Sequence, residues 1–96
     1  MTDGKATRER AVAALDRALD KSPDGAKDDL TDAIRAVAEL RDDRVKRWRH
    51  TGAADDRHGL DAVNAILSLL AGLEYPLAGI KWKRVSEARD SLKKLS

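Results

Sequence analysis

Residues 60–73 read LDAVNAILSLLAGL, the most apolar stretch in a chain of 96 residues. Its large apolar residues recur mainly at intervals of three and four, which is the spacing of one helical face. At 100° per residue, six of them cover an arc of about 140°, and Leu69 lies outside that arc. We therefore expect a helix that Asp55 or Asp56 caps, that runs to about Leu73, and that is the most buried element of the fold.

Three further segments carry apolar residues at helical spacing. The first runs from about Thr7 to Lys21 with a narrow, alanine-rich stripe, and we expect it to be the weakest helix. The second begins at Pro23, a residue suited to the first helical position, and runs to about His50. The third opens at Pro76, or nearer Ile80, and continues to about Leu95.

The short breaks between these segments favour antiparallel neighbours, and no segment alternates with the period of two that a strand requires. The sequence therefore predicts an all-α fold, a compact antiparallel bundle of four helices with three long helices and one weaker N-terminal helix. We expect a disordered N-terminus over residues 1–6 and a single helical-bundle domain over residues 7–96, since 96 residues are enough for one domain.

The composition excludes several classes of protein. The 19 basic and 17 acidic residues leave a net charge of only +2, which is typical of a solvated helical surface of mixed sign. The absence of cysteine excludes disulfides, thiol catalysis and cysteine-based zinc sites. No apolar run approaches the roughly 20 residues of a membrane span, and none follows the N-terminal residues as in a signal peptide. We expect a cytoplasmic protein.

A run of basic residues surrounds the break at residues 51–54. Its members are Arg44, Lys46, Arg47, Arg49 and, beyond the break, Arg57. Cations with an aromatic residue between them suit contacts to nucleic-acid phosphates and bases. Trp48, however, shares a helical face with Leu30 and Val37, so we expect it in the core. The cations then complement the C-terminal end of a helix, which Gly52 ends as a left-handed residue.

A second basic and aromatic group comprises Lys81, Trp82, Lys83 and Arg84. Trp82 falls about 60° from Val85, on the side away from Leu92, so we expect it to flank the core. Tryptophan with basic neighbours is typical of an interface anchor. The alternative is that Trp82 covers the end of the core with lysine stems around it. Leu69 adds further apolar surface.

No pattern in the chain indicates catalysis or metal binding. His50 and His58 are the only histidines, and they do not pair on one helical face. We therefore expect no enzyme activity, no small-molecule substrate, no metal, no cofactor and no membrane association.

The expected function is a non-enzymatic protein–protein interaction module: a small adaptor, inhibitor or regulator. It docks through a helix face or a bundle end onto another protein or onto a second copy of itself as a homodimer. The predicted partner-binding residues are Lys81, Trp82, Lys83, Arg84 and Leu69. The alternative is a nucleic-acid-binding protein that uses the basic tip around residues 44–57, with Arg44, Lys46, Arg47, Arg49 and Arg57 as the binding residues.

Overall fold

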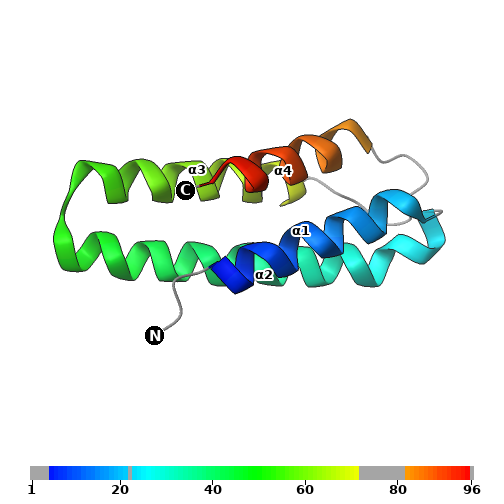
Figure 1. Ribbon diagram of the computed structural model, residues 1–96, viewed down its shortest axis with the longest axis horizontal. Helices are drawn as coiled ribbons and strands as arrows, with labels where there is room; N and C mark the ends of the chain where they lie inside the picture. Colours follow the sequence, from blue (N-terminus) through cyan, green and yellow to red (C-terminus); the bar gives the residue numbers. More distant parts are fainter. Residues whose placement is uncertain (1–4, 22, 72–81, 96) are drawn as a thin grey trace.

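Helices make up nearly all of the described chain. The computed structural model describes residues 5–21, 23–71 and 82–95, and no strand occurs in these ranges. The helices are α1 (Lys5–Asp20), α2 (Pro23–Thr51), α3 (Ala54–Ala71) and α4 (Trp82–Lys94). Successive helices run in opposite directions (Figure 1). Each packs against the next, and α4 also packs against α1, which closes the ring. The predicted all-α, antiparallel four-helix bundle is confirmed.

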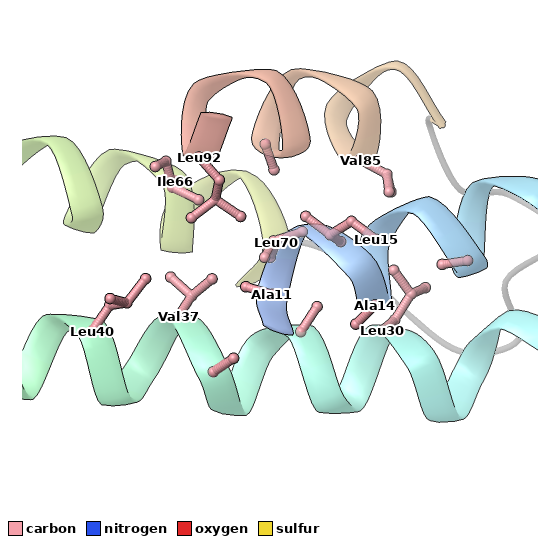
Figure 2. Close-up of a cluster of buried hydrophobic side chains, with 14 of the residues drawn as sticks. Ala11, Ala14, Leu15, Leu30, Val37, Leu40, Ile66, Leu70, Val85 and Leu92 are labelled. Carbon is pink, nitrogen blue, oxygen red and sulfur yellow. The ribbon is translucent and has the colours of Figure 1, made fainter. Parts of the chain in front are cut away.

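All four helices contribute to one apolar core. Figure 2 shows Leu15, Leu30, Leu70, Val85 and Leu92 converging on the space between the helices. All five side chains are fully or almost fully buried. Each such leucine or valine removes apolar surface from water, which contributes about 1.5–3 kcal/mol per side chain before the entropy of ordering is counted.

Helix α1 packs in the same bundle, mainly through small residues. Ala11, Ala14 and Ala18 are completely buried, and Leu15 is its one large, fully buried side chain. Since an alanine projects only a methyl group, α1 and α2 can approach closely along the stripe that the sequence analysis identified.

An ion pair that the sequence analysis did not identify joins α1 to α2. Asp29 on α2 is only 6% exposed. Its carboxylate accepts hydrogen bonds from Lys21 Nζ at 2.6 Å and from Arg17 Nε at 3.1 Å. These bonds from Lys21 and Arg17 lower the pKa of Asp29, although burial acts in the opposite direction. Asp29 is therefore an ionised carboxylate that joins the start of α2 to the end of α1.

The turn between α2 and α3 ends the longest helix. Gly52 has the predicted left-handed conformation, with φ of 64°, and its N–H donates to the Trp48 carbonyl at 2.7 Å. The prediction that Asp55 or Asp56 caps α3 is wrong. The Arg57 N–H donates to the Ala53 carbonyl at 3.1 Å, so α3 begins one residue before these acids. They lie instead in its first turn, where negative charge suits the helix dipole.

Some predictions fall on residues outside the described ranges. These are the helix start at Pro76 or Ile80, the continuation to Leu73 of the helix that was expected to begin near Asp55, and the part of the expected disordered N-terminus that covers residues 1–4. Helix α1 begins at Lys5, two residues before the predicted start. Among the described helices, none combines the length and apolar character needed to cross a membrane.

Candidate functional site

The end of the bundle that contains the α2–α3 turn is built from two helices rather than four. Helix α2 has 29 residues, whereas α1 has 16 and α4 has 13. Arg10 Nη2 donates to Glu39 Oε2 at 2.9 Å, which places the first turns of α1 beside the middle of α2. The C-terminal part of α2 and the N-terminal part of α3 extend past α1 and α4 (Figure 1). We call residues 41–59 the projecting hairpin; none of them is buried.

Trp48 lies on the projecting hairpin and outside the core, so the prediction that it enters the core is wrong. Its side chain is partly exposed, and the Arg57 guanidinium carbon lies 5.0 Å from the centre of its ring. This geometry is a cation–π contact between α2 and α3. Trp48 does share a helical face with Val37, but α1 and α4 do not extend to its level, and buried residues on α2 end at Leu40.

The predicted nucleic-acid-binding residues all lie on the projecting hairpin. Lys46, Arg47, Arg49 and Arg57 are exposed, and Arg44 is partly buried. The hairpin as a whole holds six basic and four acidic residues, so its net charge is only +2. Two of the cations also have an acidic neighbour on their own helix: Arg57 Nε lies 3.2 Å from Asp61 Oδ1, and Arg41 Nη2 lies 3.6 Å from Asp42 Oδ1. The surface is therefore a mixture of both signs rather than a continuous basic track.

A pocket lies where the projecting hairpin leaves the four-helix part of the bundle. Its volume is about 450 Å³, and we call it the step pocket. It is lined by Arg44 of α2, by Asp55, His58, Gly59 and Ala62 of α3, and by Lys94 and Leu95 at the end of α4. The step pocket therefore collects residues that lie far apart in the sequence.

Arg44 of the step pocket lies against Gly59. A Cβ added at Gly59 would lie 2.7 Å from Arg44 Nη1, so the glycine leaves the room that this guanidinium occupies. Burial lowers the pKa of Arg44, and the positive charges of Arg47 and Arg8 lower it further, whereas Asp56 raises it. Sequence reasoning singled out Arg44 but missed the pocket around it. The available signal was Gly59, because glycine inside a helix costs about 1 kcal/mol relative to alanine.

Three of the five residues predicted to bind a partner, namely Trp82, Leu69 and Arg84, are engaged with the fold. Trp82 and Leu69 are partly buried and pack against the core. Arg84 Nη2 donates to the Ser68 carbonyl at 3.2 Å, which links α4 to α3. Lys83 is exposed, with Nζ 3.9 Å from Glu87 Oε1.

Lys81, the remaining member of the predicted partner-binding set, lies outside the described residues. Trp82 begins α4, at the end of the bundle opposite the projecting hairpin (Figure 1). The structure therefore does not bring the two predicted groups together.

The two histidines lie near the hairpin turn without forming a metal site. His50 and His58 are both exposed, and His58 lines the step pocket. Within residues 5–21, 23–71 and 82–95, no group of three or more histidines and carboxylates is arranged to hold a metal ion.

Comparisons with known proteins assign no family. A scan against protein-family models, a search of curated proteins and a search of solved structures each found no match to this chain.

Proposed function

We propose that the protein is a non-enzymatic interaction module that docks onto a partner protein through the projecting hairpin. The observation that carries the proposal is Trp48, a large aromatic residue held outside the core beneath the guanidinium of Arg57. Tryptophan and arginine are the residues most enriched among the energetic centres of protein interfaces. Val45, also partly exposed and outside the core, adds apolar area one helical turn from Trp48.

The surface around Trp48 also has the mixed polar character of an interface rim. The hairpin carries six basic and four acidic side chains together with two partly exposed large apolar ones, Val45 and Trp48. A polar rim around an aromatic centre excludes water from the centre and fixes the orientation of the partner. Because the hairpin projects, it can enter a concave surface that the flat side of a bundle cannot.

The two tryptophans provide a matched test of the docking surface. The intact protein is used to capture partners from nuclease-treated lysate of its native source, alongside the variants Trp48→Ala and Trp82→Ala. We expect Trp48→Ala to lose a captured protein while its thermal unfolding changes little, because Trp48 is outside the core. Trp82→Ala is expected to lower stability and to keep the captured protein, since Trp82 packs on the core. The reverse pattern would instead favour the surface around Lys83, Arg84 and Leu69.

A nucleic-acid-binding function is the second candidate, and the five cations Arg44, Lys46, Arg47, Arg49 and Arg57 on one hairpin favour it. It predicts binding to labelled DNA or RNA with an affinity that falls steeply as salt rises. The double variant Arg47→Glu and Arg49→Glu is expected to abolish that binding without loss of helicity. Absence of binding at low salt, measured by fluorescence anisotropy, would eliminate this candidate.

The partner can also be a second copy of the chain. Sedimentation analysis of the wild type and of Trp48→Ala distinguishes such a homodimer from docking onto a different protein. A homodimer that docks through the hairpin would become monomeric in the variant, whereas a module for a different protein would sediment as a monomer in both cases.

A further inference from the structure

One face of α2 carries a line of partly exposed side chains that continues from the four-helix part of the bundle onto the projecting hairpin. We call it the α2 stripe, and its members are Ile34, Ala38, Arg41, Val45 and Trp48. They recur at alternating intervals of four and three residues, and at 100° per residue they fall within an arc of about 80°. This is the spacing at which one helix packs along another. At a rise of about 1.5 Å per residue, the stripe is about 21 Å long.

The large apolar side chains of the hairpin belong to this stripe and not to the side of the hairpin where α4 ends. That other side is polar, and the described residues that line the step pocket there include Arg44, Asp55 and His58. Val45 and Trp48 are not among them. The stripe is also continuous with the interior, because Ile34 at its first position packs against the core, whereas Val45 and Trp48 lie beyond the core. The apolar contact that α2 makes inside the bundle therefore extends along α2 to a surface on which a further helix can pack.

The flank of the α2 stripe that faces solvent is positively charged. Arg49 and Lys46 are exposed and lie about 60° and 120° around α2 from Ile34. Asp42 is on the same flank, but its Oδ1 lies 3.6 Å from Arg41 Nη2, so its charge is already opposed. Lys46 and Arg49 form no ion pair with an acid in residues 5–21, 23–71 and 82–95. Carboxylates along the flank of a packed helix would complement this charge.

A second copy of the chain fits the charge of this flank poorly. If two copies paired along their α2 stripes, each would bring its own Lys46 and Arg49 to the shared seam, and like charges beside such a seam oppose pairing. A helix with glutamate or aspartate beside its apolar face has the opposite effect. Its apolar residues, spaced by three and four, match those of the stripe.

We infer that the α2 stripe binds an amphipathic helix of the partner protein, apolar along one face and acidic beside it. This inference rests on the proposed function, since it assigns the shape and charge of the partner that docks through the hairpin. It also extends the contact to Ile34 and Ala38, which lie outside the hairpin. Val45 and Trp48 supply most of the apolar area, and the small Ala38 leaves room for a larger side chain of the partner helix.

Three synthetic peptides of about three heptads each, tested against the full chain, examine the inference. The first has leucine at positions a and d and glutamate at e and g, and the second has lysine in place of glutamate. The third has the composition of the first in an order that breaks the apolar spacing. Like charges keep each of the first two peptides from pairing with itself.

Fluorescence anisotropy of the labelled peptides gives the affinities. We expect the glutamate peptide to bind, the lysine peptide to bind several-fold more weakly, and the rearranged peptide to show no binding. Absence of binding by the glutamate peptide, or a preference for either of the other two, would overturn the inference.

Two alanines provide a matched pair of variants for the position of the contact. Ala38 is partly exposed on the stripe, and Ala65 is exposed on α3. Ala38→Asp should weaken binding of the glutamate peptide at least about tenfold, because it places an unpaired charge in an apolar contact. Ala65→Asp adds the same charge elsewhere and should change binding little. Val45→Asn, at a stripe position outside the core, should repeat the loss if Ala38→Asp lowers helicity. Equal losses at stripe and control positions would refute a defined contact.

Two double variants test the charge of the flank. Lys46→Gln with Arg49→Gln should reduce the preference for the glutamate over the lysine peptide several-fold, as expected for exposed charge pairs. Lys93→Gln with Lys94→Gln removes the same charge from exposed positions near the end of α4 and should keep the preference. An unchanged preference in the first double variant would contradict an acidic flank on the partner.

The outcomes also separate this inference from the proposed function. Partner capture that is lost in Trp48→Ala, together with no binding of the glutamate peptide, would leave docking at the hairpin intact and remove the helix assignment. Peptide binding that Ala38→Asp abolishes, together with unchanged capture by Trp48→Ala, would retain the stripe and remove the hairpin as the docking surface. A dimer that Ala38→Asp dissociates and Ala65→Asp does not, seen by sedimentation, would place a second copy on the stripe and overturn the inference.

Discussion

Two glycines near the α2–α3 turn have opposite conformational requirements. Gly52 has φ of 64°, a conformation that costs residues with a Cβ about 1–2 kcal/mol. Nothing lies within 4 Å of a Cβ added there, so the strain in Gly52→Ala would come from the backbone alone. We expect this variant to lower the free energy of unfolding in urea by about 1–2 kcal/mol.

Gly59→Ala is expected to act in the other direction. Gly59 lies within α3, where alanine is favoured over glycine by up to about 1 kcal/mol, and the atom that a Cβ would meet belongs to the flexible end of Arg44. The variant should therefore unfold at higher urea concentration, because the end of the Arg44 side chain can move away from the added methyl group. A variant that is destabilised would show that Arg44 cannot move.

The carboxylate of Asp29 makes stability depend on pH in the acid range. Lys21 and Arg17 hold its folded pKa below the ordinary value, so its contribution to stability is complete above the unfolded pKa of about 3.9 and is lost as pH falls through the lower, folded pKa. At neutral pH, Asp29→Asn should be less stable than the wild type. The difference between them should shrink as the pH falls below about 4.

Urea unfolding at neutral pH and near pH 3 checks this dependence. Asp28→Asn is the control, since Asp28 is exposed on the same helix, and it should change stability little at either pH. A difference for Asp29→Asn that is the same at both pH values would show that the charge of Asp29 does not explain its role.

At the scale of the helices, the contact between α1 and α2 depends on small side chains. Ala14 is completely buried, and replacing it with leucine would force the helices apart. We expect Ala14→Leu to lower the free energy of unfolding by about 1–3 kcal/mol, as overpacked cores do. Ala13→Leu adds the same side chain at an exposed neighbour and should change it by less than about 0.5 kcal/mol. Similar effects at both positions in urea titrations would argue against a close contact.

The sequence was sufficient to predict the helices and their buried faces. Pro23 begins α2 as predicted, and Gly52 follows its end in the left-handed conformation. The buried positions of α3, such as Val63 and Leu70, lie on the arc that the spacing defines. These features are local, because a helical face and a helix end depend on residues within a few positions of one another.

The candidate site was not predictable in the same way. The spacing of residues along the chain gives the direction in which the Trp48 side chain projects from α2. It does not give how far along α2 the neighbouring helices α1 and α4 extend. The extent of this overlap depends on how far α1 and α4 are shifted along α2. Only contacts in the folded chain, such as that between Arg10 and Glu39, show this shift. Asp29 illustrates the same limit, since its partners lie on α1 and just beyond its end.

At the scale of the whole molecule, the core lies in the four-helix part and leaves the projecting hairpin with little buried apolar surface. Local unfolding is easiest where such burial is least. We expect backbone amides of residues 45–58 to exchange hydrogen for deuterium faster than those of residues 30–40, in which Leu30, Val37 and Leu40 are buried. Exchange of both groups only through global unfolding, as measured by NMR under native conditions, would contradict this. A bound partner should slow exchange in the hairpin selectively.

The two tryptophans are separated along the long axis of the molecule, one on the projecting hairpin and one at the start of α4 at the opposite end (Figure 1). Indole emission depends on the local surroundings of each ring. Trp48, under a guanidinium and partly in water, and Trp82, against the core, therefore provide two intrinsic fluorophores in different environments. Single-tryptophan proteins, with the other residue replaced by phenylalanine, would report ligand arrival at one end and loosening of the core at the other without an added dye.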